Sequence, residues 1–246
     1  MSTSWSNWTR RPSSSLDPSE IFERPLGFTE AGFYWDSVFN RTADIIRHAH
    51  VQLQSPSLVS PSNVTRAWTT LKQRYPLLAA TTDDRSSDGI FFVVNTSRIT
   101  SITQTELQFA SIRSLKEVDA RIDGLLNGHE SPLSNNLLAC LIVLHDEVNS
   151  NEAHVLIHSA HSISDEVAHH TLLGEFLHSL CDPTSSDTPV VLSERLALAT
   201  AIEMLNPRTG LSVSRQRWRN TTARLIMMSR RAGMKVGAVL VPSQPD

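Results

Sequence analysis

The clearest pattern in the chain is a pair of long apolar runs, at residues 137–144 and 153–160. Between them lies Asp146-Glu-Val-Asn-Ser-Asn151, which is rich in turn-forming residues. Apolar runs of this length, bounded by turn signals, are typical of strands buried in a sheet. We therefore predict a β-hairpin in the middle of a sheet.

Shorter segments predict the elements around this hairpin. Alternating or short apolar runs indicate strands, at 44–53, 77–81, 90–95 and 107–112. Apolar residues spaced three and four apart indicate helices, at 63–73, 115–126, 166–180, 190–204 and 211–232. This order predicts an α/β fold, a mixed β-sheet flanked by helices and followed by a helical tail.

Composition divides the chain into three parts. Residues 1–20 are rich in serine, and we expect them to be disordered. Residues 21–181 carry the predicted sheet and form one lobe, which opens with an ordered segment at 24–30. A run of Pro, Ser, Thr and Asp follows Cys181, so residues 182–246 are expected to be a linker and a helical tail.

Net charge, apolar runs and cysteine count indicate which partners and which cellular location to expect. The net charge is −3 and no basic stripe precedes the last forty residues, so nucleic acid is not an expected ligand. The N-terminus lacks the apolar core of a signal peptide, and no apolar run approaches the roughly 20 residues of a membrane span. Cys140 lies in an apolar run, and two cysteines give no disulfide framework. We expect a cytoplasmic, reduced protein.

His161 is the residue whose setting most favours chemistry. It follows an apolar strand, Asp165 follows it after a turn of three residues, and a helix then begins. A strand end holds an imidazole rigidly, as a general base requires. Asp165 could cap the helix, pair with a distant arginine or brace the loop; each role would support His161 without contact to the substrate.

A metal site is the first alternative for the histidine-rich region. His154, His158 and His161 lie close together in the sequence, with His169, His170 and His178 after them. In a strand, however, residues 154 and 158 lie about 13 Å apart, which is too far for one ion. We predict no metal, and we expect His169 and His170 to face solvent or the sheet edge.

Three segments together resemble the chloramphenicol-acetyltransferase-like superfamily, which includes condensation domains of nonribosomal peptide synthetases and fungal alcohol acetyltransferases. The segment from His161 to Glu166 resembles the signature His-x-x-x-Asp-Gly. Arg74-Tyr-Pro76-Leu-Leu resembles the motif Arg-His-Pro-x-Leu-Arg, and Arg24-Pro-Leu-Gly27 with Glu30 resembles the opening segment. Gln216-Arg-Trp-Arg219 is similar to the linker of the fungal members.

The resemblance implies transfer of an acyl group from a thioester, on coenzyme A or a carrier protein, to an alcohol or amine. His161 would be the base and Asp165 its structural support, ion-paired with an arginine for which Arg74 is the candidate. Ser162, Ser164 and Glu166 are the expected substrate contacts beside them. No tightly bound cofactor and no metal would be required; the acyl-CoA or acyl-carrier thioester is a co-substrate.

Four departures from the family pattern bear on this expectation. Ala160 stands where condensation domains commonly have a first histidine, Glu166 replaces the glycine, and Ala79 replaces the second arginine. The matched segments also correspond to the first of two lobes, so the active-site cleft needs a C-terminal lobe or a second copy of the chain. The alternative is an inactive lobe that binds a partner or dimerises through its uncovered face.

The predicted tail helix is basic on one side, with Arg215, Arg217, Arg219, Arg224, Arg230 and Arg231. Two interpretations stay open from the sequence. The arginines form a solvated face, or they contact the phosphates of coenzyme A or the second lobe.

Overall fold

The computed structural model describes residues 7–11, 19–40, 44–85, 89–128, 130–182, 191–205, 212–215, 217–218, 221–222, 225 and 229. The chain divides into two compact units, residues 1–204 and 205–246. The described residues of the second unit from 213 onward are helical, and Arg215 and Arg217 are exposed there. The other arginines of the predicted basic helix, and Gln216, lie outside the described residues.

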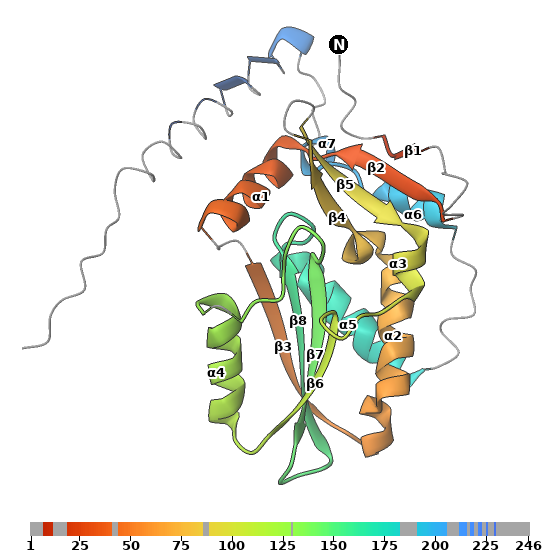
Figure 1. The fold of residues 1–246 in the computed structure, drawn as a ribbon, viewed down its shortest axis with the longest axis vertical. Coiled ribbons are helices and arrows are strands. Elements are labelled where there is room, and N and C mark those ends of the chain that lie inside the picture. The colour runs from red at the N-terminus through yellow and green to blue at the C-terminus, as the bar shows by residue number, and fades with distance from the viewer. Residues whose placement is uncertain are drawn as a thin grey trace, which may run out of the picture. The chain divides into compact units, whose positions relative to one another are not determined.

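The first unit contains two four-stranded sheets (Figure 1). The smaller sheet is antiparallel, in the order β1 (Thr9–Arg10), β2 (Ile21–Pro25), β5 (Ile90–Asn95) and β4 (Thr81–Asp84). The larger sheet has the order β3 (Asp44–Gln52), β8 (Glu152–Ala160), β7 (Ala139–Asp146) and β6 (Leu107–Ile112). In this sheet β3, β8 and β7 are antiparallel neighbours, and β6 runs parallel to β7.

Helices cover both faces of the larger sheet (Figure 1). The helical segments within the first unit are α1 (Phe28–Asn40), η1 (Pro56–Val59), α2 (Pro61–Arg74), η2 (Pro76–Ala79), α3 (Thr96–Thr100), α4 (Leu115–Leu126), α5 (Glu166–Cys181) and α6 (Leu192–Leu198). Helix α7 (Ile202–Leu205) begins in the first unit and ends at the first residue of the second. Helices α2 and α5 pack on one face of the sheet, and α4 packs on the other. None of the described helices is both long and apolar enough to cross a membrane.

The hairpin of β7 and β8 is the centre of the larger sheet, as the sequence predicts. Val143, Val155 and Ile157 point to the face covered by α2 and α5. Ile142 and Leu156 point to the face covered by α4. All five side chains are almost fully buried. Burial on both faces explains why the two runs lack the polar alternation of a surface strand.

The α/β fold predicted from the sequence is confirmed, and the structure differs from the prediction only in individual elements. The predicted boundaries of β6 and α4 agree with the structure residue for residue. The strand predicted at 77–81 is wrong, because Pro76 opens the 3₁₀ turn η2 and the strand begins at Thr81. Helix α1 is absent from the prediction, and its sequence, which contains three aromatic residues between Phe28 and Phe39, has weak helix propensity.

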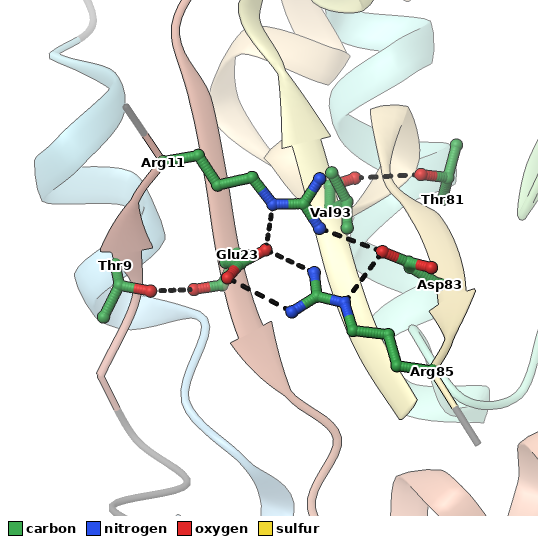
Figure 2. Close-up of polar contacts among 7 residues, drawn as sticks. All are labelled: Thr9, Arg11, Glu23, Thr81, Asp83, Arg85 and Val93. Atoms are coloured by element: carbon green, nitrogen blue, oxygen red, sulfur yellow. Dashed lines mark hydrogen bonds and ion pairs between the residues drawn. The ribbon is translucent and has the colours of Figure 1, made fainter. Parts of the chain in front are cut away.

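Part of the segment expected to be disordered is ordered. Thr9 and Arg10 form β1 beside β2, and Arg11 reaches across the sheet to Glu23 and Asp83 (Figure 2). Arg85 contacts the same two carboxylates, at 2.5 Å and 3.0 Å. Two arginines and two acids therefore join β1, β2 and β4, which fixes the N-terminal strand by side-chain contacts that sequence spacing does not reveal.

The first compact unit also extends past the lobe boundary expected at residue 181. Leu196 of α6 is buried in a core with Leu26 and Phe92. The carbonyl of Ala199, one residue after α6, accepts hydrogen bonds from the indole of Trp8 and the guanidinium of Arg24, both at 3.0 Å. The segment around α6 therefore completes the lobe.

A buried ion pair joins β2 to the start of α1. Arg24 and Glu30 are 0% and 2% exposed, and two hydrogen bonds of 2.7 Å connect their side chains. The carboxylate of Glu30 also accepts a 2.6 Å bond from the backbone N–H of Gly27, which would otherwise be unpaired at the helix start. Arg24 lies over the rings of Trp8 and Phe92. The pair therefore fixes where α1 begins.

Removing one partner of this pair should be strongly destabilising. We expect Arg24→Met to lower the free energy of unfolding by about 3–5 kcal/mol, because Glu30 would be left charged and buried without a partner. Arg10→Met is the matched control, since Arg10 and Glu20 form an exposed pair in the same region; it should cost less than about 1 kcal/mol. Urea unfolding of both variants measures the difference, and equal losses would contradict a dominant role for the buried pair.

Candidate functional site

The site begins where β8 ends, next to β3 and the loop before β7. The N–H of Ala160 donates to the carbonyl of Leu138 at 2.9 Å, which keeps this strand end in the sheet. The next three residues form a tight turn, closed by a 3.1 Å bond from the N–H of Ile163 to the carbonyl of Ala160. His161 therefore stands at the first position of a turn with fixed ends.

Two contacts fix the ring of His161. Its Nδ1 lies 2.9 Å from the carbonyl oxygen of Ser164. A carbonyl oxygen can only accept a hydrogen bond, so Nδ1 carries the proton and Nε2 of the neutral ring is left as an acceptor. The ring also stacks on Phe33 of α1, with centroids 3.8 Å apart and planes 13° apart. The half-buried imidazole therefore has a set tautomer and a set plane, which are the geometric features that a general base requires.

Asp165 is the N-cap of α5. Its carboxylate accepts a 2.8 Å bond from the backbone N–H of Ala168, and its backbone is extended, as in other N-caps. The side chain is exposed, and its position also places a negative charge at the positive end of the helix dipole. Of the roles that the sequence left open, helix capping is the one that the structure forms.

The expected ion pair between Arg74 and Asp165 is not formed. Arg74 contacts the carboxylate of Glu175, which lies on α5 about three turns further along. The physical reason is position: α2 packs along α5, and the last turn of α2 meets the middle of that helix. Arg74 therefore fastens two helices and does not brace the His161 turn.

The three predicted substrate contacts lie in different environments. Ser162 is buried at the edge of a polar cavity, and Ser164 lines an apolar one. Glu166 is exposed, and its contact with Arg47 is a weak one of 3.5 Å. The structure therefore brings Ser162 and Ser164 beside His161 and directs Glu166 toward solvent.

Two cavities adjoin the turn that carries His161. One, of about 410 Å³, is mostly apolar and is lined by Ile163, Ser164 and residues of α2, η2, α5 and α6. The other, of about 560 Å³, is more polar and includes Ala160 and Ser162 with residues of α1 and α4. Both volumes fall in the range of small-molecule sites.

Three other histidines, His48, His50 and His154, contact one another across β3 and β8. No group of three possible ligands that could hold a metal is found among the described residues. His48 Nε2 lies 2.8 Å from His154 Nδ1, and His50 stacks on His154. His158 is buried, with its Nε2 3.4 Å from Asp44. These pairs arise because β3 and β8 are neighbours, a register that sequence spacing alone does not give.

The expectation that His169 faces solvent or the sheet edge is wrong. The side chain is fully buried on α5, and its Nε2 lies 2.6 Å from the hydroxyl of Ser159. Burial, followed by the nearby charge of Arg47, lowers the pKa of His169 to about 4.

Cys140 is buried as expected, and burial raises the pKa of its thiol to about 12, so it is an unreactive core residue.

Sequence comparisons give no relative for this chain: no family model matches it, and no curated protein matches it. Solved structures do match. TlmII, a tallysomycin biosynthesis protein, aligns at a TM-score of 0.55 and 16% identity over 80% of this chain. The TRI3 trichothecene 15-O-acetyltransferase from Fusarium sporotrichioides aligns at 0.53 and 12% over 72%. The starter condensation domain of rhizomide synthetase RzmA aligns at 0.51 and 12% over 68%.

The chain has the chloramphenicol-acetyltransferase-like fold. The matches span 45%, 37% and 41% of the TlmII, TRI3 and RzmA chains, so this chain corresponds to less than half of each. That coverage agrees with one lobe of the two-lobed chloramphenicol-acetyltransferase-like architecture. At this level of identity the likeness establishes the fold, and the chemistry depends on the residues of this chain.

Capping by Asp165 predicts how substitutions at this position change stability. Asp165→Ala should lower the free energy of unfolding by about 1 kcal/mol, because the N–H of Ala168 loses its acceptor. Asp165→Asn should change it by less than about 0.5 kcal/mol, since asparagine caps helices nearly as well. Chemical denaturation of both variants, with Glu166→Gln as an exposed control, measures this. A large loss in Asp165→Asn would indicate a buried ion pair instead of a cap.

The lowered pKa of His169 predicts a loss of stability in mild acid. Between pH 6.5 and about 4 the unfolded state binds a proton at His169 that the folded state excludes. The free energy of unfolding therefore decreases as the pH is lowered through this range, by up to about 3 kcal/mol. Above pH 6.5 both states are neutral and the effect vanishes. His169→Asn should flatten this part of the stability–pH curve relative to wild type, whereas the exposed His170→Asn should leave it unchanged.

Proposed function

We propose that this chain supplies the histidine-bearing lobe of an acyltransferase, which moves an acyl group from a coenzyme A or carrier-protein thioester to an alcohol or amine. The observation that carries the proposal is the bond between His161 Nδ1 and the carbonyl of Ser164. It leaves Nε2 as the basic atom of an imidazole held at a strand end. The chloramphenicol-acetyltransferase-like fold supports the same class of reaction.

In the proposed reaction Nε2 of His161 takes the proton from the acceptor as its oxygen or nitrogen attacks the thioester carbonyl carbon. The tetrahedral adduct then breaks its carbon–sulfur bond, and the leaving thiolate receives the proton from the imidazolium. The products are an ester or amide and a free thiol. No acyl-enzyme is formed and no oxidant or metal is needed, so one correctly oriented histidine carries the proton transfers.

Phe33 and Ser164 each fix one part of the orientation of the His161 ring. The stacked ring of Phe33 fixes the plane of the imidazole, and the carbonyl of Ser164 fixes its rotation within that plane. Asp165 acts one step further away, because it holds the start of α5 and therefore the end of the turn. Glu166, exposed to solvent, has no role in the proposed proton transfer.

The chain spans less than half of the solved structures that it matches, so the remaining walls of the site are part of the proposal. A second lobe, in the same polypeptide or from a second copy of the chain, would close the face that carries His161. The competing function is that of an inactive lobe that binds a partner. The two functions are distinguished by whether a protein assembly of known mass releases thiol from a thioester.

A thioester assay with a histidine control tests the proposal. Release of free thiol from acyl-CoA or an acyl-carrier thioester is followed with panels of alcohols and amines, and the mass of the protein assembly is recorded in parallel. His161→Ala should lower kcat by about 10²–10⁴-fold, because the general base is lost. His170→Ala, an exposed histidine of α5, should keep full activity. Equal rates in the two variants, or no thiol release by a stable assembly, would favour the binding lobe.

A further inference from the structure

The polar cavity beside Ser162 has features that the proposed proton transfer does not explain. It lies between α1, the end of α4, the loop before β7 and the end of β8, and it measures about 560 Å³. Its lining includes Tyr34, Asp44, Ser131, Asn135, Ala160 and Ser162. Among the described residues that line it, Asp44 is the one with a formal charge.

Asp44 is incompletely satisfied within the described part of the chain. Its side chain is 14% exposed. Oδ2 accepts a long bond of 3.3 Å from the hydroxyl of Ser131 and lies 3.4 Å from Nε2 of His158. Oδ1 is buried and has no hydrogen-bond partner among the described residues. A buried carboxylate oxygen without a donor is costly, so the carboxylate of Asp44 is short of donors within the described part of the chain.

Tyr34 supplies a complementary group on α1. Its hydroxyl oxygen accepts a 3.3 Å bond from the amide of Asn135, so the hydroxyl proton remains available to donate. Burial raises the pKa of this phenol, which therefore keeps its proton at neutral pH. The cavity thus combines an anionic acceptor with a neutral donor, and a ligand that matches both carries a cationic donor and an oxygen acceptor.

We propose that this cavity binds a small amino alcohol, whose ammonium group pairs with Asp44. Charge complementarity favours the ammonium, because the lining offers one carboxylate and no described cationic side chain. A charge-assisted bond to the partly exposed carboxylate of Asp44 would supply a donor that the described part of the chain does not. The hydroxyl of the ligand would be the acceptor of the proposed acyl transfer, so the identity of this substrate rests on the proposed function.

The cavity adjoins the turn that carries His161, although His161 itself is not one of its lining residues. Ala160 and Ser162, the two residues on either side of His161, both line it. Helix α1 contributes Tyr34 to the cavity and, at the preceding residue, Phe33 to the stack on His161. A ligand anchored by its ammonium at Asp44 would therefore occupy a space that shares two walls, α1 and the end of β8, with the proposed base.

Binding of a charged probe and a neutral isostere tests the inference without any thioester. The full chain is titrated with 5-amino-1-pentanol and with 1,5-pentanediol, and backbone amide NMR shifts at Ala160 and Ser162 report occupancy. We expect the amine to bind at least about tenfold more tightly, as a charge-assisted bond predicts. Asp44→Asn should remove that preference, and Asp119→Asn, an exposed carboxylate of α4, should leave it intact.

Equal binding of amine and diol by the wild-type protein would overturn the inference, because the ammonium group would then gain nothing from Asp44. If Asp44→Asn does not fold, Tyr34→Phe provides the second variant. That change should weaken 5-amino-1-pentanol several-fold and leave pentylamine, which has no hydroxyl, unaffected; equal effects on both would also overturn the inference.

The thiol-release assay then separates this inference from the proposed function. If the amine binds in an Asp44-dependent manner but no thiol is released, the amine site stands and the acyltransferase proposal fails. His161-dependent turnover without a preference for the amine retains the acyltransferase and rejects the amine site.

Discussion

The buried ion pair of Arg24 and Glu30 is the constraint on which the candidate site depends. It sets the first turn of α1, because Glu30 pairs with Arg24 and also accepts the N–H of Gly27. Helix α1 then carries Phe33 onto His161 and Tyr34 into the polar cavity. Arg24 also binds the carbonyl of Ala199 after α6. One buried charge pair thus connects the smaller sheet, the segment around α6 and the helix that positions the proposed base.

The turn after β8 holds the proposed base, His161, in a fixed geometry. The strand end is hydrogen-bonded in the sheet and α5 is capped, so residues 161–165 have little freedom at either side. Within that span the carbonyl of Ser164 selects the tautomer of His161, and the ring of Phe33 selects its plane. Residues of this turn line two cavities, Ile163 and Ser164 the apolar one and Ser162 the polar one, whereas His161 itself lines neither.

Local patterns in the sequence were sufficient to predict the elements that have a clear periodicity or that are buried on all sides. Helix α4 and strand β6 follow from periodicity, and the β7–β8 hairpin from two apolar runs. The resemblance singled out His161 and Asp165. The stacking partner of His161 was not predictable, because Phe33 lies more than a hundred residues away in the sequence and meets the turn through α1. Glu175, the true partner of Arg74, required the packing of α2 against α5.

The role of Asp165 in this structure differs from the ion pair that the resemblance implies. In this chain a backbone carbonyl already fixes the tautomer of His161, so the aspartate is not needed to orient the ring. Its carboxylate instead completes the first turn of α5, and that turn carries Ala168 along the apolar cavity. The motif spacing therefore follows from chain geometry: a strand end, a closed turn of three residues and a helix cap. Any side chain that caps a helix would preserve that geometry, whereas the proposed proton transfer depends on the imidazole at position 161.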